Sequence, residues 1–268
     1  MKLVKNHQQQ IKRIIDIAMS IILVFLMAYQ VTGEKVHEWI GIIMFILVIT
    51  HQVLNMKWYS SLFIGKYNIN RVIMIIINVL LLLSFTITAV SGMSMSNYAV
   101  PFLYKMFDVS VARELHLVFS YWSFILMGLH IGIHVNLISI NINKKIGKTE
   151  KKHLQIVLES LFIIIAGYGF CLFLKSEIVN YISFRTRFAF LDYEKNQILV
   201  LLENIAILIF FVEIMHYIIS FIRKFSSHNI IDRTINRSKN ENIELLSLIK
   251  VSLILLIGIT MYIVLQIK

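Results

Sequence analysis

The stretch HEWIGIIMFILVITH, residues 37–51, begins and ends with histidine and is almost wholly apolar between the two. Fourteen residues of α-helix rise about 21 Å and turn the second side chain by only about 40° from the first. Both imidazoles therefore project from one side of a single helix. Polar groups at membrane depth are costly and are candidates for function, so this stretch bears on both the fold and the function.

The composition indicates a membrane protein. The chain has 268 residues, of which 58% are hydrophobic. A bilayer core of about 30 Å needs about 20 apolar residues per crossing helix. Runs of suitable length lie at residues 14–32, 37–56, 72–93, 114–139, 154–174, 197–222 and 246–267. These runs predict an all-α integral membrane protein with about seven transmembrane helices.

The charge pattern predicts how the chain crosses the membrane. The net charge is +11, and 18 of the 26 Lys and Arg residues lie in four alternate segments, which begin at residues 1, 55, 141 and 223. Basic segments stay in the cytoplasm. We therefore expect a multi-pass protein of the cell membrane with a cytoplasmic N-terminus and an extracytoplasmic C-terminus. Basic loops of this kind bind anionic lipid headgroups, and they do not indicate a nucleic-acid partner.

The histidine pattern occurs twice. The copies read His37-x13-His51-x3-Asn55 and His116-x13-His130-x3-His134. A Thr-Gly pair at 32–33 and a Ser-Gly pair at 91–92 precede the copies, each expected at the outer end of the preceding span. A repeat of this length indicates a duplicated helical hairpin. Residues 1–140 are therefore predicted to form a four-helix bundle.

The repeat places the histidines at two levels. The helices that carry it run in the same direction, so His37 and His116 (the outer pair) share one level and His51 and His130 (the inner pair) the other. Helix bundles hold cofactors between facing helices, and histidine is an axial ligand of haem iron. We expect two b-type haems with these four histidines as metal ligands. Zinc or copper is less favoured, because levels about 21 Å apart cannot share a metal.

Several further residues are candidates for supporting the haems. His134 lies one turn beyond His130, so either could reach the inner iron, but His134 would stretch the interval to about 27 Å against about 21 Å on the other helix, which favours His130. His134 would then hold a propionate, meet a quinone or have no role. The basic residues at the helix ends are placed to meet propionates or lipid headgroups, and they are Arg13, Arg71, Lys35 and Arg113. The glycines at 33, 41, 92, 128 and 132 leave room for a cofactor or serve ordinary helix packing.

The rest of the chain carries fewer signals. Residues 141–153 are predicted to be a basic cytoplasmic linker, and residues 154–268 a three-helix membrane region. The sixth run contains Glu203, Asn204, Glu213 and His216, which suit a proton path, a quinone pocket or an interfacial position. No nucleotide-binding motif occurs. Electrons would therefore come from a membrane quinol or a partner dehydrogenase.

Three segments resemble the flavinylation-associated cytochrome family, whose plan is related to ferric-reductase-like and other cytochrome b bundles. They are TGEKVHEWIG (32–41), HQVLNMKWY (51–59) and ARELHLVFSYWSFILMGLHIGIH (112–134), and the resemblance covers roughly residues 10–140. It implies that His37, His51, His116 and His130 bind haem. It also implies electron transfer across the membrane to an extracytoplasmic protein carrying covalent FMN. The chain contains no flavin attachment motif, so the flavin is expected on that partner.

The expected function is that of an electron-transfer subunit of a membrane oxidoreductase system. The alternative is a non-redox polytopic carrier or assembly anchor, in which the histidines would bind substrate or serve packing. Haem content distinguishes the two classes.

Overall fold

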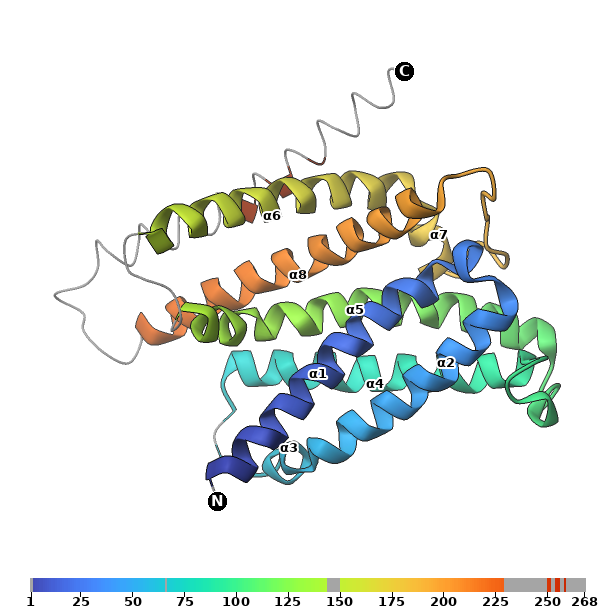
Figure 1. Ribbon diagram of the computed structural model, residues 1–268, viewed down its shortest axis with the longest axis horizontal. Helices are drawn as coiled ribbons and strands as arrows, with labels where there is room; N and C mark the ends of the chain where they lie inside the picture. The colour runs from blue at the N-terminus through green and yellow to red at the C-terminus, as the bar shows by residue number, and fades with distance from the viewer. Residues whose placement is uncertain are drawn as a thin grey trace. The chain divides into compact units, whose positions relative to one another are not determined.

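The computed structural model describes residues 2–65, 67–143 and 150–228, with residues 250, 251, 254, 255 and 258 (Figure 1). Its elements are α1 (Lys2–Met27), α2 (Tyr29–Leu54), α3 (Met56–Ser61), α4 (Ile69–Met95), η1 (Pro101–Leu103), α5 (Val109–Asn143), α6 (Glu150–Lys175), α7 (Ile178–Ile182) and α8 (Gln197–His228). No strand occurs in these described ranges. The prediction of an all-α protein is confirmed for them.

Five of the described helices are long and apolar enough to cross a membrane. The crossing segments are Tyr29–Leu54, Ile69–Met95, Val109–Val135, Ile156–Lys175 and Gln197–Arg223. They correspond to the second to sixth of the expected spans. The chain is therefore a multi-pass helical membrane protein, and the sides on which its termini lie remain a prediction from the basic segments.

The other two expected spans differ in outcome. The run at 14–32 does not qualify, because α1 ends at Met27 and its apolar half shares the helix with Lys12, Arg13 and Asp16. The chain turns at Ala28, and α1 packs against α2. The run at 246–267 lies mostly outside the described residues.

A break at Gly33 divides α2 into a short first piece and a long second piece. Gly33 has φ 67° and ψ 170°, a conformation that side-chain-bearing residues rarely adopt. The Thr32–Gly33 pair therefore lies inside α2, whereas it was expected at the end of the preceding span. Ser91 and Gly92 do lie near the end of α4, as expected.

The described helices belong to two compact units, each drawing on separate parts of the chain. The first comprises residues 1–67, 84–121 and 181–202, and the second residues 68–83, 122–180 and 203–268. The predicted division into residues 1–140 and 154–268 remains a prediction from sequence. Residues 144–149 of the expected linker (141–153) lie outside the described residues, and the two ends of that linker belong to α5 and α6.

Close helix packing dominates the second unit. A Cβ on Gly128 would lie 2.7 Å from Cβ of Phe211, and one on Gly132 would clash with the carbonyl oxygen of Val212. Gly169 makes a similar approach to Ala206. Gly128 and Gly132 therefore let α5 approach α8, so the packing alternative applies to them.

Candidate functional site

The outer pair of histidines comes together in the first unit. His37 lies one turn after the Gly33 break on α2, and His116 lies near the start of α5. Their ring centroids are 6.0 Å apart, with the ring planes at 75°. Imidazoles on opposite sides of one metal, each with a metal–nitrogen distance of about 2.0–2.1 Å, have centroids about 6.3 Å apart. The pair therefore has the separation that a shared metal requires.

The ring nitrogens of this pair are suited to ligation. Nδ1 of His116 lies 2.9 Å from the carbonyl oxygen of Thr88, so the Nδ1–H tautomer donates there. That tautomer leaves the lone pair on Nε2, a common arrangement for metal-binding histidines. Nδ1 of His37 is buried and has no hydrogen-bond partner among the described residues, although the backbone of Leu26 lies within hydrogen-bonding reach of the His37 ring. Burying a polar group without a partner is costly, so this nitrogen is a candidate for an external ligand.

Two neighbours define the surroundings of the outer pair. A Cβ on Gly92 would lie 3.0 Å from Cε1 of His116, so the imidazole packs directly on the α4 backbone. The ring of Tyr29 lies 5.1 Å from that of His37 in an edge arrangement. The small residue on α4 is therefore needed for His116 to occupy this position.

A carboxylate clamp lies beside His37. Glu38 accepts hydrogen bonds from the hydroxyl of Ser96 and from three consecutive backbone N–H groups, those of residues 97–99, at 2.8–2.9 Å. Hydrogen bonds to an ionised acceptor are stronger than neutral ones. The clamp fixes the α2 segment that carries His37 to the segment that follows α4. Sequence reasoning missed Glu38, although an acidic residue next to a candidate ligand was a usable signal.

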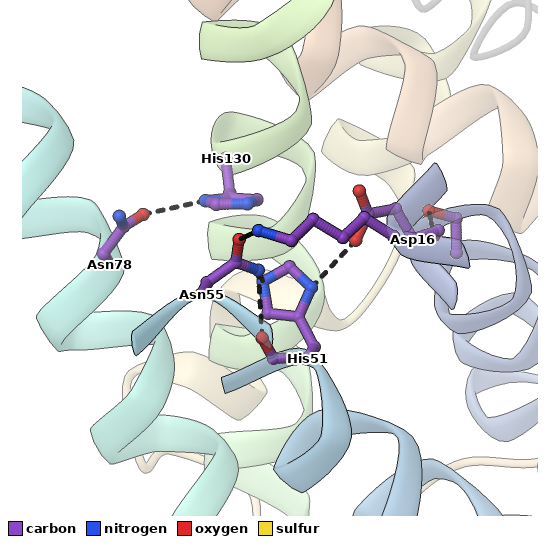
Figure 2. Close-up of polar contacts among 7 residues, drawn as sticks. Asp16, His51, Asn55, Asn78 and His130 are labelled. Carbon is purple, nitrogen blue, oxygen red and sulfur yellow. Dashed lines mark hydrogen bonds and ion pairs between the residues drawn. The ribbon is translucent and has the colours of Figure 1, made fainter. Parts of the chain in front are cut away.

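His51 takes part in a polar network on α1 and α2 (Figure 2). Its Nδ1 lies 2.8 Å from Oδ1 of Asp16, and its Nε2 lies 3.3 Å from Nδ2 of Asn55. Lys12 donates to Oδ1 of Asn55 at 2.9 Å. Sequence reasoning found no carboxylate within a turn of His51, but α1 brings one to it. The signal was the i, i+4 spacing of Lys12 and Asp16, which puts both on one helix face.

His130 lies in the second unit. Its Nδ1 lies 2.8 Å from Oδ1 of Asn78, which belongs to the same unit (Figure 2). The ring of His134 lies 4.9 Å from that of His130. His51 belongs to the first unit, so its pairing with His130 remains a prediction from the repeat. Asn78, a lone amide in an apolar helix, was a second signal that sequence reasoning missed.

Three of the four basic residues expected to meet propionates lie near the start of a helix, whereas Arg13 lies in the middle of α1 (Lys2–Met27) and not at the helix end where it was expected. Arg13 and Arg113 are exposed, Arg71 is half-buried near the start of α4, and Lys35 is exposed just after Gly33. Glu114, beside Arg113, pairs with Arg187 at 3.5 Å. Their roles toward a cofactor remain predictions.

The chain's own side chains do not complete a metal site within the described ranges. No group of three or more His, Cys, Asp or Glu residues is suitably arranged there to hold a metal ion. A pair of imidazoles suits a metal whose other ligands come from a macrocycle, and it does not suit tetrahedral zinc. The donor set of the outer pair therefore fits haem better than a bare ion.

No protein-family model, curated protein or solved structure matches the chain. The resemblance to the flavinylation-associated cytochromes therefore rests on the motifs around the histidines.

Proposed function

We propose that this chain carries electrons across a membrane through two b-type haems, one bound by the outer pair and one by the inner pair. The observation that carries the proposal is the outer pair itself, two facing imidazoles 6.0 Å apart that come from corresponding positions of a repeat. When bound, haem iron supplies reversible one-electron transfer.

The surrounding residues would orient the outer ligands. The carbonyl of Thr88 fixes the tautomer and ring of His116, and Gly92 leaves space for that ring. The Glu38 clamp holds the segment that carries His37. Such neighbours of a ligand set its direction and basicity.

The proposed direction of transfer follows the family resemblance. Electrons would enter from a membrane quinol or a cytoplasmic-side dehydrogenase and leave to an extracytoplasmic FMN protein. Sealed vesicles of each orientation, reduced with quinol and then given a purified flavinylated acceptor, test this. Reoxidation only where the extracytoplasmic face is accessible supports the direction, and equal reoxidation at the cytoplasmic face contradicts it.

The haem content of the full chain tests the proposal directly. Protein purified from haem-sufficient cells should show the spectrum of low-spin b-type haem at about two haems per chain. A matched control is His7→Ala, because His7 is exposed near the start of α1. A colourless preparation that is folded and helical would overturn the proposal.

One observation favours the non-redox alternative. Both ring nitrogens of His51 already have hydrogen-bond partners, Asp16 and Asn55. A histidine whose two nitrogens are both hydrogen-bonded is consistent with a structural role in a carrier or an assembly anchor. For Nε2 of His51 to bind iron, the Asn55 side chain would have to move away from it. The same haem measurement decides between the two functions.

A further inference from the structure

A polar cluster lies in the second unit, inside the membrane-crossing part of α8. Glu213 is only 9% exposed as a residue, and Tyr217, one helical turn further on, is 5% exposed. The Tyr217 side chain is hydrogen-bonded to the Glu213 carboxyl. Tyr217 also packs in an apolar cluster with Ile163, Phe210 and Ile254, so these polar groups lie beside apolar side chains.

Lys250 lies next to Glu213 and Tyr217 and is bonded to a second glutamate. Nζ of Lys250 donates to Oε1 of Glu159 on α6 at 2.8 Å. The same Nζ lies 5.6 Å from the centroid of the Tyr217 ring. The contacts therefore connect four side chains in the order Glu159, Lys250, Tyr217 and Glu213.

The charges of the cluster do not balance if both carboxyl groups are ionised. Lys250 is the cation bonded to Glu159. The other titratable group that faces Glu213 is Tyr217, and His216 and Arg223 lie further along α8, with His216 also near Glu159 and Lys250. Nδ1 of His216 is itself buried and has no hydrogen-bond partner among the described residues. Two carboxylates that share one ammonium repel each other, which favours retention of one proton.

The depth of Glu213 determines which carboxyl holds that proton. Glu213 precedes Arg223, the last residue of the crossing segment of α8, by ten residues. That interval is about 15 Å of helix, half of a core of about 30 Å. Glu159 is paired and its side chain is 52% exposed. An ionised carboxylate costs most at the deeper and more buried of the two positions.

We propose that Glu213 is a membrane-buried proton-binding site, with Tyr217 as its hydrogen-bond partner and the Glu159–Lys250 pair as the charged group next to it. The ligand of the site is a proton. The site is independent of the proposed electron transfer, since none of its groups is proposed to bind haem.

Carbodiimide labelling of the unmodified chain tests the proposal. Dicyclohexylcarbodiimide is apolar and reacts with protonated carboxyl groups in membranes. The acid oxygen adds to the central carbon, the carboxyl proton moves to nitrogen, and no electrons are transferred. Protein in lipid nanodiscs is treated at acidic and at alkaline pH, and labelled glutamates are located by peptide mass spectrometry. We expect Glu213 to be labelled several-fold more than Glu159 or Glu203, and the labelling to fall as pH rises.

Infrared spectroscopy at neutral pH provides the deciding measurement. The carboxylic-acid stretching band should be lost in Glu213→Gln and kept in Glu203→Gln, the matched control on the same helix. Loss of the band supports the site even if the reagent does not reach Glu213. A band that survives in Glu213→Gln, or labelling of Glu159 in place of Glu213, overturns the proposal. Haem content of the same samples reports separately on the proposed function.

Discussion

The two histidines of α2 lie in contrasting surroundings. At His37, Nδ1 is buried without a hydrogen-bond partner among the described residues, and the facing side chain is another histidine, His116. At His51, Nδ1 is bonded to Asp16 and Nε2 to Asn55. Equal spacing in the repeat therefore fixes where each imidazole projects, whereas the neighbouring helices decide whether its nitrogens are available to a ligand.

Replacing an outer histidine should have the largest effect. His116→Ala or His37→Ala removes one of the two proposed ligands of the outer haem, so haem content should fall from about two per chain to about one. Pyridine haemochrome assays and redox titration measure this. His134→Ala is the control and should keep both haems. Loss of both haems from folded His116→Ala protein would contradict the proposal that the outer and inner pairs bind haem independently of each other.

A bulky residue at Gly92 should have the next largest effect. Gly92→Leu forces a side chain into the place of the His116 ring, and overpacking of this kind costs about 1–3 kcal/mol. The haem of the outer pair should therefore bind roughly tenfold more weakly or worse. Gly41→Leu is a matched control on α2, because a Cβ there has no atom within 4 Å. Equal haem loss in the two variants would show that Gly92 has no specific role.

Removing the Glu38 clamp should destabilise the outer level. Glu38→Ala takes the acceptor away from Ser96 and three backbone N–H groups. Hydrogen bonds to a charged group contribute about 1.5–3 kcal/mol, so we expect a loss of about 2 kcal/mol. Thermal unfolding followed by circular dichroism in detergent measures it. Glu114→Ala removes a partly exposed pair with Arg187 at 3.5 Å and should change stability by less than about 1 kcal/mol.

Replacing Asp16 should have the smallest effect, and only haem binding by the inner pair should change. Asp16→Ala removes the acceptor that orients Nδ1 of His51, and loss of such a partner weakens metal binding by about tenfold. Asp16→Asn keeps an oxygen acceptor and should recover most of the loss. Titration of haem into the apoprotein measures both. A change confined to the haem of the outer pair would contradict the contrast between the two levels.

The length of the apolar runs predicted five of the membrane-crossing helices well. The expected spans at 72–93 and 197–222 fall within α4 and α8. The end of the first expected span, residue 32, was wrong, because α1 ends at Met27. MAYQV continues the apolar run without a glycine or proline, so nothing local marks the turn at Ala28. The turn accompanies the packing of α1 against α2. That packing is a tertiary contact, so no local sequence pattern predicts it.

The candidate site was predictable only in part. The repeat predicted that His37 and His116 share a level, and the structure brings them together. The repeat did not predict the Glu38 clamp beside His37, nor Asp16 and Asn78 as the partners of His51 and His130. A lone polar residue in an apolar helix can face any adjacent element, so its partner depends on the tertiary arrangement.

The Gly33 break has a consequence for how α2 tolerates changes in length. In a continuous helix, an added residue rotates all the residues after it about the helix axis. Gly33 is not helical, so a residue added between Ala28 and Gly33 need not rotate the part of α2 that follows Gly33. An added residue between His37 and His51 would swing one imidazole about 100° relative to the other. We expect insertions to be tolerated before the break and to separate the two imidazoles onto different helix faces after it.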